Sequence, residues 1–295
     1  MKEVKHIDFR DQIARNKFKS FLLSLIVFAT LIAIGYVIGL AVSADFFGFM
    51  TLWIIFSIGY IWVSYYFSSN IALLSVGAKE ADQKAYRNLY NIVEGLAIGS
   101  GLPMPKIYIM NENQINAFAS GRDYKHAVIC VTTGSLEKLN KEELEGVLAH
   151  ELSHIKNYDI RFATLVAVMV GMISIISQIF LRSLWYGSRD RDNGKGNAVF
   201  LLIGIVLAIV APILVKLVQL AISRRREFMA DAGSVEITRY PKGLISALKK
   251  ISNDKPMKVN GAVAPLFFSD PMKKFFNLMS THPPIEQRVK ALEAM

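Results

Sequence analysis

The stretch His150-Glu151-Leu152-Ser153-His154 is the most informative part of this chain of 295 residues. Residues four apart on an α-helix project from the same face, so both imidazoles can reach one tetrahedral Zn²⁺ while Glu151 lies beside the water that such an ion activates. The chain has only five histidines, which makes a chance pairing at this spacing uncommon. The alternative is a helix with two solvated or core-packed histidines. The spacing favours a zinc site with a general base.

The residues around this motif predict a helix from Lys141 to about Asn157. Asn140 is the expected N-cap, and Glu143 three residues later gives a variant of the capping box. The motif residues lie beside an apolar stripe that recurs at helical spacing, formed by Leu144, Leu148, Leu152 and Ile155.

A second motif is the pair of acids in the stretch 226–231, Arg-Glu-Phe-Met-Ala-Asp. Glu227 and Asp231 are four apart on a predicted helix, where like charges repel each other, so a cation should compensate them. Zn²⁺ on Glu227, with Asp231 accepting an N–H from a ligand histidine, would provide that cation. The alternative is that the acids pair with the arginines at 224–226. Two membrane crossings between His154 and Glu227 would bring both to the same membrane face, which favours the metal site.

Four long apolar runs flank these motifs, and hydrophobic residues make up 53% of the chain. The runs are 20–44, 46–78, 162–181 and 196–215. Each run is long enough for a helix of the ~20 residues needed to cross a bilayer, so we expect four transmembrane helices. A signal peptide is the alternative for the first run, but that run is too long and a second run follows at once. The third and fourth runs could also be buried helices of a soluble core, although their length favours the membrane.

Charges beside the runs predict their orientation. Six basic residues precede the first run, whereas Asp45 is the only charge between the first and the second, so we expect the N-terminus in the cytoplasm. Four crossings would return both polar segments to that side. The loop 182–195, with four basic and two acidic residues, indicates the opposite orientation. The net charge of +10 is not accompanied by a nucleic-acid-binding motif. The basic residues cluster beside the apolar runs, which indicates membrane lipid rather than nucleic acid as a partner.

The expected organisation alternates membrane and water-facing parts. A transmembrane hairpin at 1–78 is followed by the first part of a catalytic domain at 79–159, with the zinc-binding helix. A second hairpin at 160–222 precedes the second part of that domain at 223–295, with the third zinc ligand. Asp159 is interpreted as the polar edge where the third run enters lipid, rather than as a group that supports the site.

Short strands are predicted at 106–110 and 127–132, which are rich in β-formers. The segment 116–119 lies between them and is a candidate for a third strand. Cys130, in the second predicted strand, is the only cysteine, so an intramolecular disulfide is excluded.

Taken together, these features resemble the HtpX family of membrane-bound zinc metallopeptidases. The resemblance covers essentially the whole length: the paired apolar runs, both motifs, the segment Asn116-Ala117-Phe118-Ala119 and the late His282-Pro283-Pro284. It implies an α+β fold class: a mainly helical integral membrane protein with four transmembrane helices and a zincin-like catalytic domain that carries a small β-sheet. The implied location is the bacterial cytoplasmic membrane, with the catalytic domain facing the cytoplasm.

The resemblance also implies roles for the motif residues. One Zn²⁺ per chain is expected on His150, His154 and Glu227, with Glu151 as the catalytic acid/base. The segment 116–119 is expected to pair with extended substrate by β-augmentation, the alternative being an ordinary strand.

The late motif has two interpretations in this scheme. His282 begins the pattern His-Pro-Pro-Ile-x-x-Arg, which ends at Arg288. The histidine is a candidate for stabilising the transition-state oxyanion or capping the site. The alternative is a rigid turn before an amphipathic helix at 285–295.

The implied function is an endopeptidase of protein quality control and stress response, which cuts misfolded or damaged membrane and membrane-associated proteins at the cytoplasmic face. A dedicated substrate, such as a processed C-terminal tail, would suit the same chemistry. A rival of another class is a membrane transporter or scaffold with a structural zinc site. Such sites usually have a fourth protein ligand, often cysteine, for which Cys130 would be available. The near absence of charge within the apolar runs disfavours an ion path.

Overall fold

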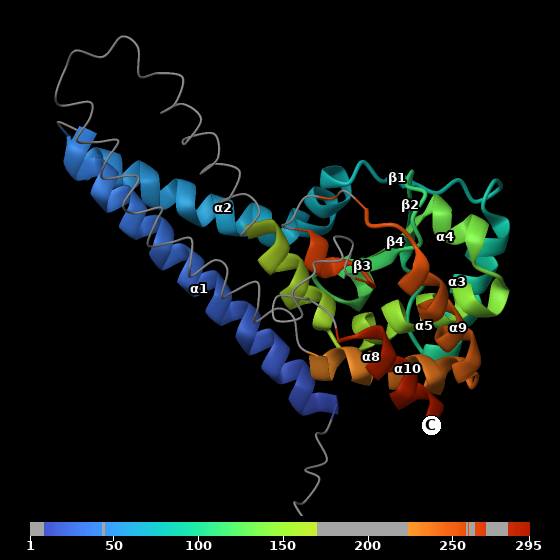
Figure 1. Ribbon diagram of the computed structural model, residues 1–295. Helices are drawn as coiled ribbons and strands as arrows, with labels where there is room; N and C mark the ends of the chain where they lie inside the picture. Colours follow the sequence, from blue (N-terminus) through green and yellow to red (C-terminus); the bar gives the residue numbers. More distant parts are fainter. Residues whose placement is uncertain (1–8, 43–44, 170–223, 258, 260–262, 270–282) are drawn as a thin grey trace, which may run out of the picture.

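The computed structural model describes residues 9–42, 45–169, 224–257, 259, 263–269 and 283–295 (Figure 1). The third apolar run beyond residue 169, the whole fourth run and His282 lie outside the described residues.

Two long helices form a hairpin that projects from the rest of the chain, α1 (Phe9–Val42) and α2 (Phe46–Ser75) (Figure 1). By length and composition both can cross a membrane, over Asn16–Leu40 and Phe46–Ser75. Only 6% of the apolar window of α2 is buried, whereas a core helix of a soluble protein would be mostly covered. The exposed side chains are large and apolar, among them Leu52, Ile55 and Trp62. This surface suits lipid, and two of the four expected spans are therefore present as helices of sufficient length.

A helix over residues 159–169 contains the start of the third apolar run and packs against this hairpin. Tyr60 of α2 donates its hydroxyl hydrogen to the carbonyl of Met169 at 3.0 Å. The shared apolar cluster contains Leu23, Val27 and Leu31 from α1 and Phe162, Leu165, Val166 and Met169 from the third run.

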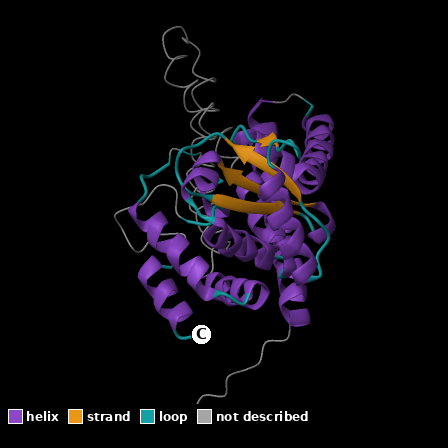
Figure 2. Ribbon diagram, turned by 90° about the vertical axis from the view of Figure 1, so that its right-hand side faces the viewer, coloured by secondary structure: helices purple, strands orange, loops and turns teal. Residues whose placement is uncertain are grey.

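A four-stranded sheet, with strand order β1-β2-β4-β3, lies beside the C-terminal end of α2 (Figures 1 and 2). The strands are β1 (Lys79–Glu80), β2 (Lys106–Met110), β3 (Ala117–Gly121) and β4 (Ala127–Thr132). β2 and β4 are parallel, and β3 pairs antiparallel with β4 at the edge of the sheet. The two strands predicted at 106–110 and 127–132 are confirmed, and the third begins one residue later than predicted.

The two faces of this sheet have different neighbours. Odd-numbered residues such as Ile107, Ala119 and Ile129 face the helices at 87–100, 141–156 and 241–253. Even-numbered residues such as Phe118 and Cys130 face the end of α2 and the helix at 159–169. Successive strand residues point to opposite faces, so the sheet separates the membrane side from the helical side.

The helical side contains α3 (Arg87–Ser100), α5 (Lys141–Lys156), α8 (Arg224–Thr238), α9 (Pro241–Asn253) and α10 (Ile285–Glu293), and the short helix α4 (Thr133–Lys138) leads into it. α5 lies at its centre, in contact with α3, β3, α8 and α9. The predicted capping box is present in α5. Asn140 Oδ1 accepts from the Glu143 amide at 2.9 Å, and Glu143 Oε2 accepts from the Asn140 amide at 2.8 Å. This helix is more deeply buried than an amphipathic stripe predicts, because neighbours surround its C-terminal half.

Close packing of α8 on α5 depends on one glycine. A Cβ atom at Gly233 would lie 2.2 Å from the hydroxyl oxygen of Ser153. Beside this contact, Ser234 donates to the carbonyl of Gly146 at 2.8 Å. The two helices that carry the motif residues are thus held at a short separation.

Candidate metal centre

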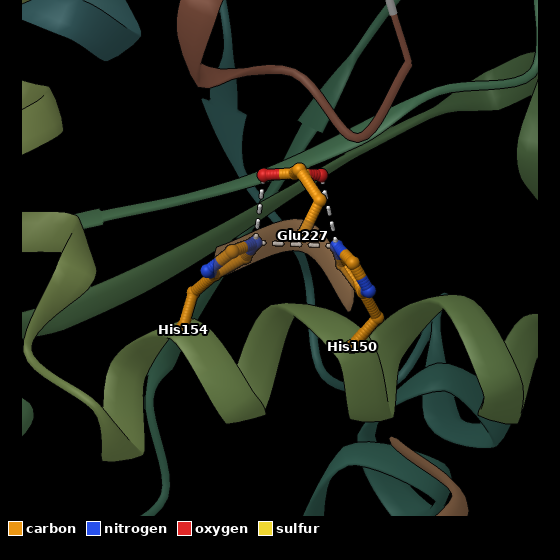
Figure 3. Close-up of side chains that lie close together, drawn as sticks. All are labelled: His150, His154 and Glu227. Atoms are coloured by element: carbon orange, nitrogen blue, oxygen red, sulfur yellow. Dashed lines mark hydrogen bonds and ion pairs between the residues drawn. The ribbon is translucent and has the colours of Figure 1, made fainter. Parts of the chain in front are cut away.

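Two histidines of α5 and one glutamate of α8 point toward a common centre (Figure 3). His150 Nε2 lies 3.7 Å from Glu227 Oε2, and His154 Nε2 lies 3.6 Å from Glu227 Oε1. The two Nε2 atoms are 3.2 Å apart. One donor atom from each side chain lies within 4.8 Å of the other two. Two imidazoles and one carboxylate form a donor set typical of catalytic zinc sites.

The far side of His150 is held by a buried carboxylate. His150 Nδ1 lies 2.9 Å from Asp231 Oδ1, and both side chains are fully buried. Burial would raise the pKa of Asp231, but the charge of Arg288 and hydrogen bonds from His150 and Arg288 lower this pKa to about 2. An ionised Asp231 accepts the Nδ1 proton and leaves Nε2 to face the centre. The contact predicted between Asp231 and a histidine of the motif is therefore present.

His154 is held in the same way by Asp159, which corrects the sequence interpretation. His154 Nδ1 lies 3.2 Å from Asp159 Oδ2, and Asp159 is only 4% exposed. The chain turns sharply after α5, with Tyr158 at a φ of 56°, and this turn brings the carboxylate back toward the last turn of the helix. Asp159 is thus not a polar edge facing lipid. An acid soon after a predicted helix end is the signal that could have identified it.

Three carboxylates around His154 favour the positively charged form of its side chain. Burial lowers the pKa of His154, but the hydrogen bond to Asp159 and the charges of Glu227, Asp159 and Glu151 raise it to about 9. A histidine that takes up a proton this readily occupies a site suited to a cation. The donor chemistry and the charge of these residues therefore fit a divalent metal.

Glu151, between the two histidines, points toward β3. Its Oε2 accepts a hydrogen bond from the Ala119 amide at 2.7 Å. Its Oε1 is buried and has no hydrogen-bond partner among the described residues. Burial raises the pKa of Glu151, and the negative charge of Glu227 adds to this effect. A bound cation would act in the opposite direction.

The edge strand β3 is already occupied by another part of the chain. The Phe268 amide donates to the Ala117 carbonyl at 2.8 Å, and Phe118 forms an isolated antiparallel bridge with Phe267. The side-chain amide of Asn116 pairs with the backbone of Ser269, at 3.2 Å and 3.3 Å. The segment predicted to bind substrate thus lies at a sheet edge whose outer side pairs with residues 267–269.

Arg288 is a site residue whose role the sequence did not reveal. Its guanidinium is 1% exposed, stacks on the Phe268 ring at 4.7 Å and lies 4.0 Å from Glu227 Oε2. In the amphipathic helix α10, Arg288 shares the buried face with Leu292. An arginine at an apolar position of the helical pattern is the signal that could have identified it.

Cys130 lies apart from the donor atoms. It is on the membrane side of the sheet, in a cluster with Ala72 and Phe267, whereas α5 packs on the other side. Among the described residues, the group of possible metal donors contains no cysteine. Burial raises the pKa of the Cys130 thiol, which disfavours the thiolate that a metal requires.

Known proteins resemble this chain over most of its length. Residues 83–295 match the model of peptidase family M48. A protein named "Protease HtpX homolog" from Caldanaerobacter subterraneus is 46% identical over 289 residues, covering 96% of each chain. One of the same name from Streptococcus thermophilus is 43% identical over 296 residues, covering 97% of this chain and 99% of its own. The crystal structure of S. mikatae Ste24p aligns at a TM-score of 0.48 and 18% identity, over 96% of this chain and 66% of that one, a likeness too distant to argue from. By these matches the chain belongs to peptidase family M48, and within that family to the HtpX group of membrane metalloproteases.

Proposed function

We propose that this membrane metalloprotease is a zinc endopeptidase that hydrolyses misfolded or damaged membrane and membrane-associated proteins at the cytoplasmic face. His150, His154 and Glu227 would hold one Zn²⁺, and Glu151 would act as general base and then as general acid. The observation that supports this proposal most directly is the convergence of those three donors beside buried Glu151, one oxygen of which has no hydrogen-bond partner among the described residues.

Zinc bound to these three side chains would polarise the substrate carbonyl and lower the pKa of water toward ~7. The residues around it orient the reacting groups. Ala119 holds one oxygen of Glu151 at 2.7 Å, so that the other oxygen is left to take a proton from the attacking water. Glu151 then delivers that proton to the leaving amine.

Asp231 and Asp159 support this chemistry without touching substrate. Each accepts from the Nδ1 of one ligand histidine, at 2.9 Å for His150 and 3.2 Å for His154. Such partners fix the ring orientation and the tautomer of a ligand histidine, and their loss typically lowers metal affinity about 10-fold to 100-fold.

We propose β3 as the element that binds substrate in extended form. Its outer edge runs past Glu151, because Ala119 donates to that carboxylate. A peptide that pairs with this edge would have to replace the contacts that residues 267–269 now make with Ala117 and Phe118. His282 remains a candidate for the oxyanion or for capping the site.

The cytoplasmic location is supported by charge and by geometry. The first helix is preceded by six basic residues. The hairpin returns to its starting side, because Asn16 near the start of α1 contacts Asp159 after α5, and α2 ends against the sheet (Figure 1). Lys290 is exposed on α10. In a Lys290→Cys, Cys130→Ala double variant, the single cysteine should react with a membrane-impermeant maleimide only after the cytoplasmic side of the membrane has been opened. Labelling of intact cells would place the catalytic domain outside.

The rival with a structural zinc has less support. A structural site needs a fourth protein ligand, and the described residues provide only three donors at this centre, none of them cysteine.

The test is cleavage of an unfolded model protein by the full chain purified in detergent, with metal content measured in parallel. The wild type should cut, Glu151→Gln should retain zinc and be inactive, and Glu227→Ala should lose zinc. Lys290→Ala, on an exposed face of α10, is the matched control and should behave as wild type. Full activity of Glu151→Gln would rule out the proposed mechanism, and a wild type that binds no zinc would rule out the proposed metal site.

A further inference from the structure

A polar side chain of the first long apolar helix, α1, contacts a residue of the candidate metal centre. Asn16 of α1 is the first residue of the candidate span Asn16–Leu40 and is 2% exposed. An amide buried at the start of an apolar helix is costly unless its hydrogen bonds are made. In sequence it stands far from every residue of the centre, so only the packing of α1 brings it there.

Asn16 contacts the segment that closes α5. Its side-chain nitrogen donates to Asp159 Oδ1 at 2.8 Å and to the carbonyl oxygen of Asn157 at 3.1 Å. Asn157 is the C-cap of α5. Both hydrogens of the amide are therefore used on the turn that presents Asp159 to His154.

Asp159 divides its two oxygens between different partners. Oδ2 lies 3.2 Å from His154 Nδ1, and Oδ1 receives Asn16 at 2.8 Å. Arg226, the neighbour of Glu227, also approaches Oδ1, with Nε at 3.8 Å. Asn16 therefore holds the oxygen of Asp159 that does not face His154, and it makes the shorter of the two contacts with that oxygen.

We propose that Asn16 is a positioning residue of the metal centre, which acts on His154 through Asp159. This inference rests on the proposed zinc site and adds a component that belongs to the membrane anchor rather than to the catalytic domain. It follows that the packing of α1 against the helix at 159–169 and the affinity for zinc are coupled. A change that displaces α1 weakens zinc binding, although the proposed ligands lie on α5 and α8.

The test measures zinc affinity of the full chain in detergent by competition with a chelator at fixed pH. Asn16→Ala should weaken zinc binding about 3-fold to 10-fold, less than the roughly 10-fold to 100-fold expected for Asp159→Ala, because it acts one contact further away. In an Asp159→Ala background, Asn16→Ala should have no further effect. The visible absorption of the cobalt-substituted chain should shift in Asn16→Ala, because the orientation of one histidine ligand changes.

Ser20→Ala is the matched control. Ser20 lies one turn further along α1 and is 3% exposed. In the part of the chain that the structure describes, its hydroxyl donates to the carbonyl of Asn16 at 2.9 Å, within the same helix. Its substitution should leave the zinc affinity and the cobalt spectrum unchanged. Asn16→Leu, an apolar side chain of similar size, provides the same measurement should the alanine variant fold poorly.

The outcomes separate this inference from the proposed function. Equal zinc affinity of Asn16→Ala or Asn16→Leu and wild type would overturn the positioning role and leave the zinc site intact. Additive losses in the double variant would also overturn it, since Asn16 would then act on the fold and not through Asp159. Failure of the wild type itself to bind zinc would refute the proposed site, and the inference with it.

Discussion

Arg288 and Asp231 form a buried bidentate ion pair behind the metal centre. Arg288 Nε and Nη2 lie 2.9 and 2.6 Å from the two carboxylate oxygens of Asp231. Asp231 in turn accepts from His150. The pair connects α10, at the end of the chain, to a proposed zinc ligand on α5.

Replacing Arg288 with Ala should destabilise the protein by about 3–5 kcal/mol, because it leaves a buried carboxylate without its partner. Zinc affinity should fall as well, since an unanchored Asp231 no longer fixes His150. Arg288→Lys should restore little, because an ammonium cannot bind both oxygens in the same geometry. Thermal unfolding and chelator competition measure both effects. A wild-type melting temperature in Arg288→Ala would show that the pair does not stabilise the fold.

Replacing Gly233 with Ala should separate α8 from α5. The new Cβ would lie 2.2 Å from Ser153 Oγ and 2.9 Å from its Cβ, and overpacking of this kind costs about 1–3 kcal/mol. Because α8 carries Glu227, zinc affinity should fall too. Ser153→Gly in the same chain should recover part of both losses.

Gly95→Ala on α3 is the control for that experiment. Apart from its own chain neighbours and the nearby backbone of α3, no described heavy atom lies within 4 Å of the position its Cβ would take. Alanine is the better helix former there, so stability should rise by up to about 1 kcal/mol. Equal destabilisation by the two substitutions would argue against close packing as the cause.

Removal of zinc should lower the melting temperature of the wild type, because a ligand that binds only the folded state stabilises it. Glu151→Gln should lose as much stability on chelation as the wild type. Glu227→Ala should show little further change, because it binds the metal weakly from the start. Differential scanning fluorimetry with and without chelator gives all three values. A chelator effect in Glu227→Ala as large as in the wild type would exclude Glu227 as a ligand.

Glu143 at the start of α5 should make stability depend on pH. Burial raises the pKa of Glu143, but hydrogen bonds from Lys250, Ser246 and Asn140 lower it below its ordinary value of 4.5. A carboxyl with a lowered pKa contributes its stabilisation fully above the pKa of the unfolded chain. That contribution is lost as the pH falls through the pKa of the folded state.

Comparison of Glu143→Gln with the wild type tests this dependence. Glutamine can keep the capping hydrogen bond but not the charge paired with Lys250, whose Nζ lies 2.7 Å from Glu143 Oε2. The wild type should be more stable at pH 7, and the difference should shrink below about pH 4.5. A difference that stays constant from pH 7 to pH 3 would contradict the assignment.

Local features of the chain were predictable because each depends on residues close in sequence. The cap formed by Asn140 and Glu143, the strands at 106–110 and 127–132, and the shared face of His150 and His154 follow from backbone geometry and spacing. The first two apolar runs were recognisable by length alone.

Contacts between distant residues were predictable only where the number of membrane crossings placed both residues on the same side. The contact of Glu227 with the two histidines is the example, because two crossings separate them in sequence. Asp159 was misread because its position depends on a sharp turn, which sequence spacing does not encode. The pairing of residues 267–269 with β3 had no sequence signal, since any extended segment can satisfy a strand edge.

The sequence by itself determined which residues can hold zinc, because donor chemistry and the helical repeat are properties of a few neighbouring residues. Asp231 was also predicted as a partner of a ligand histidine, but only the tertiary structure decided which histidine it holds and which other residues support the centre: Arg288 behind Asp231, and Asp159 with Asn16 behind His154. These partners lie on separate helices, and their meeting depends on the directions in which α1, α5, α8 and α10 pack. Hydrophobic burial drives that packing but is not directional. It therefore does not specify, from the sequence alone, which polar side chains meet behind the centre.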